Sequence, residues 1–354
     1  MKISTGLGGT NRASESENGL LREIDYIVEA QKLGLDMIWA AEAWSADGIS
    51  PLAYLAARTS GLTLGTSILQ LSARTPVVTA MTAMTMATLT GNRFILGLGV
   101  SGPQVVEGLH SQTFDHPAGR MREYIEIVRL AFSGRKLEYP GRFYQLPIPG
   151  GEGKAIRLGQ VPNPSIPIHL AALGPKMLEL TGELGDGWLA NSFTPETADF
   201  YLRQLSAGRT KAGKTMEGFD IKVQLACGVA DDPQPLIDAH KTRLAFTLGG
   251  MGSAKTNFYN AAYRRIGYEA AAAEVQSLFV SGARDEAARR VPDEMVLRTT
   301  LIGTEAMVRD RVRKYRDAGV TILHLLPLGD SHARRLETMA RTIKLIREET
   351  AAVA

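Results

Sequence analysis

Eight apolar, β-type runs alternate with stretches of helical periodicity along the chain, and this alternation restricts the possible folds more than any other feature. The expected strands lie at residues 2–7, 36–41, 62–69, 93–99, 166–171, 187–191, 219–229 and 321–326. Helical spacing, or a proline suited to a first helical turn, marks residues 20–34, 50–60, 76–90, 117–133, 175–185, 304–318 and 334–348, and a further helix begins at residue 195. Strands that alternate with helices form parallel sheets. Eight such pairs predict a single α/β domain over residues 1–354, a (β/α)8 TIM barrel, whereas a doubly wound sheet more often has fewer strands.

Three stretches depart from this rhythm. Residues 139–158 are rich in glycine and proline and contain two short β-like runs, which predicts a protruding hairpin or loop near residues 139–160. Residues 233–300 are too long for one crossover and have the pattern of several helices, so we expect a helical insertion there. A polar loop rich in glycine and serine is expected over residues 8–19.

Charge, cysteine content and hydropathy limit the classes of partner. The net charge of +3 gives no reason to expect a nucleic-acid partner. Cys227 is the only cysteine, which excludes an intrachain disulfide and favours the cytoplasm. No apolar run reaches the roughly 18 residues that a membrane span requires. The expected partner is therefore a small-molecule substrate.

In a (β/α)8 barrel the chemistry lies at the carboxyl ends of the strands, so the residues that follow each strand are the candidates for a site. These ends contain no Ser/His/Asp set and no cluster of metal-ligating residues. We therefore predict no metal site, and a metal-dependent barrel hydrolase is disfavoured.

The fourth expected strand leads into a glycine-rich stretch. Gly97, Gly99 and Gly102 have G-x-G-x-x-G spacing, and glycine lets the backbone approach a flat or anionic ligand closely. A dinucleotide-binding loop of the Rossmann type would stand on the first strand, whereas three strand–helix pairs precede this one and Pro103 interrupts the turn. Backbone contact with a cofactor is the favoured interpretation, and a plain tight turn is the alternative.

Two other strand ends carry candidate residues. Glu42 follows the second strand and has two interpretations, a hydrogen-bond acceptor for a ligand or a strand-end ion pair. Trp44 lines either an apolar substrate pocket or the core. After the fifth strand, Leu173 to Met177 open a helix whose free N–H groups suit a phosphate, with an ordinary helix start as the alternative. The ammonium of Lys176 opposes the helix dipole there, which favours a bound anion.

Four segments together resemble the luciferase-like superfamily, and within it the oxidoreductases that use coenzyme F420, an 8-hydroxy-5-deazaflavin with a phosphate and an anionic glutamyl tail. The segments are GLDMIWAAEAW, LTLGTSILQLSARTPVVTA, RFILGLGVSGPQVVEG and HLAALGPKMLELTGELGDGWLAN. This branch includes methylenetetrahydromethanopterin reductase and the F420-dependent glucose-6-phosphate dehydrogenase. The resemblance covers nearly the whole chain and implies a homodimer.

The resemblance also implies roles for individual residues. It places a non-prolyl cis peptide at Ser67–Ile68, as a bulge that backs the deazaflavin ring, and an acid near the ring at Glu42. The backbone after Gly99 would flank the cofactor. The remaining cofactor-binding residues would form the phosphate-binding helix start: Leu173, Gly174, Lys176 and Met177.

One departure from the family pattern bears on the substrate. In the sugar-phosphate dehydrogenase a histidine follows the acid of the second strand and serves as the base, but this chain has Ala43 there. Oxidation of glucose-6-phosphate is therefore not expected. The catalytic candidates for proton transfer are Glu42, Glu107 and His110, with water as an alternative.

The sequence thus predicts an F420-dependent oxidoreductase that transfers a hydride to or from an unidentified small organic substrate. An FMN-dependent monooxygenase of the same superfamily is the first alternative. A non-catalytic F420-binding protein is the second.

Overall fold

The computed structural model describes residues 1–8, 18–251 and 257–351, and eight parallel strands in it close into a barrel. Neighbouring strands follow the order β1-β2-β3-β5-β8-β9-β10-β12, and β12 pairs with β1. The strands are β1 (Lys2–Gly8), β2 (Met37–Ala41), β3 (Thr63–Thr66), β5 (Phe94–Gly99), β8 (Ile168–Ala171), β9 (Gly187–Ala190), β10 (Asp220–Val229) and β12 (Ile322–Pro327). The predicted (β/α)8 barrel is confirmed.

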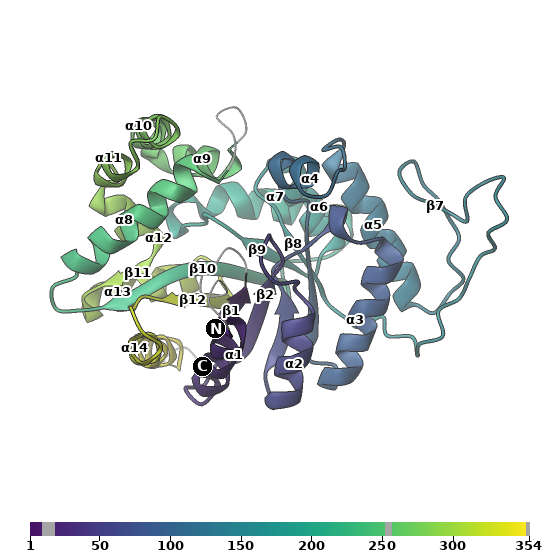
Figure 1. The fold of residues 1–354 in the computed structure, drawn as a ribbon, viewed down its shortest axis with the longest axis horizontal. Coiled ribbons are helices and arrows are strands. Elements are labelled where there is room, and N and C mark those ends of the chain that lie inside the picture. Colours follow the sequence, from purple (N-terminus) through teal and green to yellow (C-terminus); the bar gives the residue numbers. More distant parts are fainter. Residues whose placement is uncertain (9–17, 252–256, 352–354) are drawn as a thin grey trace.

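Helices surround this barrel (Figure 1). They are α1 (Gly19–Gln31), α2 (Ser50–Arg58), α3 (Pro76–Thr90), α5 (Pro117–Phe132), α6 (Pro175–Leu184), α7 (Ala198–Lys211), α13 (Glu305–Asp317) and α14 (His332–Ala351). Proline stands in the first turn of α2, α3, α5 and α6, where its missing N–H costs no hydrogen bond. None of the described helices is both long and apolar enough to cross a membrane.

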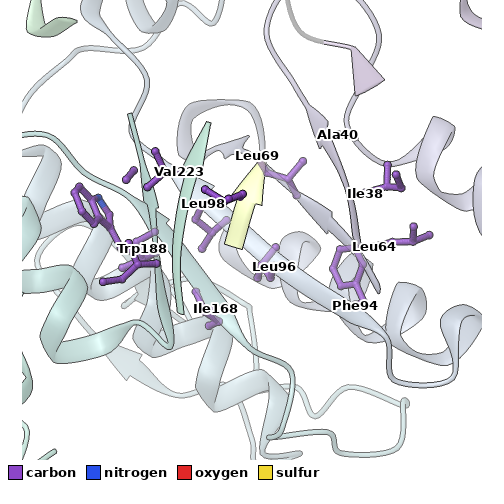
Figure 2. Packing of buried hydrophobic residues seen from close by; sticks show 14 of the residues in the cluster. Ile38, Ala40, Leu64, Leu69, Phe94, Leu96, Leu98, Ile168, Trp188 and Val223 are labelled. Carbon is purple, nitrogen blue, oxygen red and sulfur yellow. The ribbon is translucent and has the colours of Figure 1, made fainter. Parts of the chain in front are cut away.

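The largest apolar cluster lies between the outer faces of the strands and the helices that cover them. Figure 2 shows side chains of this cluster, contributed by β2, β3, β5, β8, β9, β10 and the short strand β4 (Leu69–Gln70). Parallel strands covered on the outside by helices bury both faces, which explains their nearly continuous apolar sequences. This outer shell fixes the positions of the strand ends at which the candidate site lies.

The barrel interior is filled differently, by large aromatic and polar side chains that stand opposite glycines. A Cβ atom added at one of these glycines would lie within 3 Å of the facing ring. The pairs are Gly6 with His324, Gly65 with Trp39, and Gly187 with His169. His324 and His169 are almost completely buried, and burial lowers the pKa of each, to about 4 for His169. The interior histidines are therefore neutral near pH 7.

Both predicted insertions are present. The helical insertion comprises α8 (Gln234–Gly249), α9 (Phe258–Tyr263), η4 (Arg264–Tyr268), α10 (Glu269–Val280), α11 (Arg284–Arg289) and α12 (Asp293–Thr299), with an apolar cluster of its own. The hairpin consists of β6 (Tyr139–Pro140) and β7 (Gln145–Leu146), which pair antiparallel and project beyond α5 (Figure 1). Glu123 of α5 anchors its turn by accepting hydrogen bonds from the N–H groups of Arg142, Phe143 and Tyr144.

Several details differ from the sequence-based expectation. The third strand is interrupted after Thr66 and resumes as β4 (Leu69–Gln70), because a bulge separates the two parts. The stretch after β5 contains a short helix, α4 (Pro103–Gly108), that begins at the proline expected only to interrupt a turn. An additional strand, β11 (Leu301–Gly303), pairs with β10 outside the barrel. Most of the loop expected at residues 8–19 lies outside the described residues.

Candidate functional site

The bulge between β3 and β4 lies at the carboxyl end of the barrel. Its Ser67–Ile68 peptide bond is cis, as the family resemblance implies. The Ser67 N–H donates to the Ala40 carbonyl at 2.7 Å, and the Ile68 carbonyl accepts from the Glu42 N–H at 3.2 Å. Both ends of the bulge are therefore hydrogen-bonded to the end of β2 and the residue that follows it. Ser67 and Ile68 are only half-buried.

The glycines of β5 are required by this bulge. A Cβ atom at Gly97 would lie 1.7 Å from the Thr66 carbonyl oxygen, and one at Gly99 would lie 2.8 Å from Cδ1 of Ile68. The Thr66 hydroxyl also donates to the Gly97 carbonyl and accepts from the Gly97 N–H, both at 2.8 Å. Packing within the chain thus accounts for glycine at these two positions, and contact between Gly99 and a cofactor stays a prediction.

Glu42 forms an ion pair with Arg74, one of the two arrangements that its position at a strand end allows. Its Oε2 atom lies 2.9 Å from Nη2 of Arg74 and accepts the Gly48 N–H at 3.0 Å. The hydrogen bond to Glu42 raises the pKa of the Arg74 guanidinium. Only about a tenth of the Glu42 side chain is exposed. In this arrangement the carboxylate fastens the loop after β2, and its role toward a ligand stays a prediction.

His110 belongs to a hydrogen-bonded chain that fixes its tautomer. The Gln70 amide nitrogen donates to the Glu42 backbone carbonyl at 2.9 Å, because a carbonyl oxygen only accepts. The amide oxygen of Gln70 therefore faces Nε2 of His110, 3.0 Å away, and Nε2 must carry a hydrogen. The other ring nitrogen, Nδ1, makes no hydrogen bond with any described residue. Of the three catalytic candidates, His110 is thus the one that is both oriented and available.

Glu107 and Trp44 are not brought together with this chain of hydrogen bonds. Glu107 is exposed on α4 and accepts a hydrogen bond from the Phe114 N–H at 3.3 Å. Trp44, 55% exposed in the loop after β2, is not part of the core. An exposed indole at this end of the barrel is accessible to a ligand, and its place in a substrate pocket stays a prediction.

The start of α6 has the properties of an anion site. No side chain caps this helix at Gly174, and a Cβ atom there would meet no atom within 4 Å. Lys176 is exposed in the first turn, next to half-buried Met177. Arg265, from the helical insertion, donates to the Leu173 carbonyl at 3.4 Å. Uncapped N–H groups, open space and two cations are suited to a phosphate or carboxylate.

Arg265 and Lys222 are candidate site residues that sequence reasoning missed. Arg265 is brought to the barrel by η4, and no local pattern indicates that contact. Lys222 lies inside the barrel, where it donates to the Ser67 hydroxyl at 3.0 Å. Its sequence signal is a lysine in the strand DIKVQLACGV, between apolar neighbours. In a parallel barrel the strand faces are buried both inside and outside, so this lysine could have been identified as a buried cation.

The residues at the carboxyl end of the barrel fit a flat molecule with an anionic tail. The bulge at Ser67–Ile68 and the start of α6 follow β3 and β8, which both pair with β5. The first offers a half-exposed apolar surface, and the second offers N–H donors and cations. A deazaflavin or flavin has a planar ring and at least one phosphate, so either would match this combination of features.

Comparison with known proteins supports the same interpretation. The family model described as luciferase-like monooxygenase matches residues 1–321. A Mycobacterium tuberculosis protein named "Putative coenzyme F420-dependent oxidoreductase" is 41% identical over 307 residues, which cover 84% of this chain and 88% of that protein. The 5,10-methylenetetrahydromethanopterin reductase of Archaeoglobus fulgidus is 29% identical over 324 residues, 91% of this chain and 94% of the reductase.

The fold has solved counterparts. The F420-dependent tetrahydromethanopterin reductase of Methanopyrus kandleri superimposes with a TM-score of 0.78 at 21% sequence identity. The superposition covers 96% of this chain and 97% of that chain. At this identity the likeness concerns the fold alone, which is the same barrel.

Proposed function

The chain belongs to the luciferase-like monooxygenase family, and from this premise we propose that it is an F420-dependent oxidoreductase that transfers a hydride between the deazaflavin C5 atom and a small organic substrate. The observation that carries the proposal is the open start of α6, with Lys176 and Arg265 beside uncapped N–H groups. The names of the relatives described above favour the deazaflavin over FMN.

In this proposal the cofactor supplies the hydride chemistry. The chain binds the cofactor, orients it toward the substrate and shields both from water. The start of α6 holds the phosphate and the anionic tail. Ser67 and Ile68 support one face of the ring. Hydride transfer depends more on orientation and a dry pocket than on a strong base, which agrees with alanine at position 43. Reduction of a C=C or C=N bond, or oxidation of an alcohol, are the candidate reaction types.

His110 is the proposed proton donor or acceptor. Its Nε2–H is held by Gln70, so Nδ1 is the ring nitrogen that is free to accept a proton or release one. His110→Gln is expected to lower turnover of an accepted substrate about 100-fold, because general acid–base catalysis contributes at least that much. The dissociation constant for F420 should stay within about twofold of wild type. His116→Gln, on the same loop but paired with Asp115, is the matched control and should change neither quantity.

The first experiment is a pair of fluorescence titrations of the purified protein, with oxidised F420 and with FMN. Micromolar or tighter F420 binding, with much weaker FMN binding, is the expected result. Preference for FMN would instead favour the monooxygenase, and oxygen consumption with reduced flavin would then be measured. Tight F420 binding without turnover of any substrate in a broad panel would favour a carrier protein. Failure to bind either cofactor would contradict the proposal.

A further inference from the structure

Lys222 is a buried cation without a counter-charge. It is 3% exposed on the inner face of β10, and it forms no ion pair with any described residue. Its ammonium has two contacts, the Ser67 hydroxyl at 3.0 Å and the face of Trp39, whose ring centroid lies 5.0 Å from Nζ. Burying an unpaired charge is costly, and such residues cluster at functional sites.

The other ionisable groups that face Lys222 do not neutralise it. His324 on β12 and His169 on β8 are close enough to interact with the ammonium, and burial keeps both rings uncharged near pH 7. Desolvation lowers the pKa of Lys222 itself to about 7. The positive charge is therefore poorly stabilised in the protein alone, and a nearby anion would stabilise it.

The contact with Ser67 links this charge to the candidate ring site. An ammonium has hydrogens but no lone pair, so the Ser67 oxygen must act as the acceptor. The hydroxyl hydrogen is then left to donate elsewhere, and no acceptor for it is present among the described residues. Ser67 belongs to the bulge against which the ring is proposed to lie. This bulge therefore carries a polarised O–H donor that is in contact with a buried cation.

We propose that Lys222 is a positioning residue that acts through Ser67, and that its ammonium is the counter-charge of an anionic deazaflavin ring bound against the Ser67–Ile68 bulge. The inference rests on the proposed function. The 8-hydroxy group of the deazaflavin is conjugated with the ring carbonyls, so its ionisation spreads negative charge over the ring. FMN lacks this hydroxyl, and Lys222 would thus favour the deazaflavin over the flavin.

The proposal predicts a pH dependence of binding whose sign follows from linkage. Below about pH 7 Lys222 is already protonated, so it adds no pH dependence. Above that pH, binding of the anionic ring draws a proton onto Lys222. The dissociation constant therefore rises by up to about tenfold per pH unit until the pKa of the complex is reached. Lys222→Met should lack this component.

The test is F420 titration of wild type and Lys222→Met between about pH 6 and about pH 9. Calorimetry in two buffers of different ionisation enthalpy gives the proton uptake. Wild type should take up a proton above pH 7 and Lys222→Met should not. Lys211→Met is the matched control, because Lys211 lies on the surface of α7 with its pKa raised by Glu183. This variant should behave as wild type.

Ser67→Ala leaves the lysine in place, and it tests the same inference if Lys222→Met does not fold. Loss of the hydroxyl should weaken F420 binding about tenfold at pH 6, the usual effect of one charge-assisted hydrogen bond. Unchanged binding by Ser67→Ala, or identical pH profiles and proton uptake for wild type and Lys222→Met, would overturn the inference. F420 binding by wild type would in that case still uphold the proposed function. No F420 binding by wild type at any pH would overturn both.

Discussion

At the scale of single residues, the carboxylate of Glu42 has two possible tasks that make different demands on the chain. If Glu42 anchors the loop after β2, its carboxylate needs a cationic partner. Arg74 is that partner, with its guanidinium 2.9 Å from the carboxylate. A ligand contact would need a carboxylate oxygen to face the barrel mouth, whereas both oxygens lie within reach of Arg74. The ion pair is largely shielded from solvent, so it should be worth more than an exposed pair.

A double-mutant cycle separates the two tasks. Glu42→Gln and Arg74→Met should each destabilise the protein by about 1–3 kcal/mol, and the double variant should lose little more than either single variant. Equilibrium unfolding in urea measures these changes, and F420 titration of the same proteins measures binding. If Glu42→Gln weakens binding much more than Arg74→Met does, Glu42 contacts the ligand directly and the loop-anchor interpretation is wrong.

At the scale of elements, the close contact between the bulge and β5 explains why two strand positions tolerate only glycine. Gly97→Ala would place a methyl group against the Thr66 backbone carbonyl, which cannot move without breaking the hydrogen bonds of Thr66. We expect a loss of about 3 kcal/mol or more, at the upper end for overpacking. Thermal unfolding of the purified variant provides the measurement.

Gly108→Ala is the control for this substitution. Gly108 ends α4, and an added Cβ there meets nothing within 4 Å. Alanine should be neutral or should stabilise the short helix by up to about 1 kcal/mol. If both variants were equally stable, the close approach of β3 and β5 would not be the reason for glycine at position 97.

The elements were predictable from the sequence where the pattern was long and regular. Eight strand–helix pairs, both insertions and the glycine-rich exit of β5 follow from periodicity and from turn residues. The short elements β4, α4 and β11 were missed, because two to six residues carry too little periodicity to distinguish a strand or helix from a loop. The predicted start of α6 is present, with Lys176 exposed beside it.

The parts of the site that escaped prediction depend on contacts between distant segments. Arg265 reaches Leu173 across 92 positions, and Lys222 reaches Ser67 across 155. Glu42 could be placed at a strand end, but its ion pair with Arg74 depends on how two loops fold over one another. Lys222 could have been identified as a buried lysine in an apolar strand, but the partners in these contacts are set by tertiary packing and leave no local signal.

At the scale of the whole molecule, the two ends of the described chain lie close together, on the side of the barrel where the strands begin. Figure 1 shows both termini beside α1 and α14. Arg347, near the end of α14, donates to the Met1 carbonyl at 3.4 Å and pairs with Asp36 at 2.8 Å. The catalytic candidates are at the opposite ends of the strands.

A circular permutant should therefore keep the fold. Joining the two ends with a short flexible linker and opening the chain in the exposed turn after β7, between Gly150 and Gly151, breaks no strand of the barrel. We expect circular dichroism and F420 affinity close to those of wild type. A permutant opened between Leu96 and Gly97, inside β5, is the contrasting case and should not fold. Loss of the fold in the permutant opened after β7 as well would show that an unbroken connection between β7 and β8 is required for folding.

The opposed glycines and rings of the barrel interior have a consequence for how such sequences diverge. At each of three glycines the atoms nearest to an added Cβ belong to one ring: His324 at Gly6, Trp39 at Gly65, and His169 at Gly187. A larger residue at the glycine position requires a smaller residue at the position of the ring, so a substitution at one position of a pair depends on the residue at the other. Among descendants of a common ancestor, the two members of each pair should change in the same lineages. An alignment of related sequences should therefore show correlated substitutions within each of the three pairs that line the barrel interior. Residues of the apolar shell outside the barrel should vary more independently.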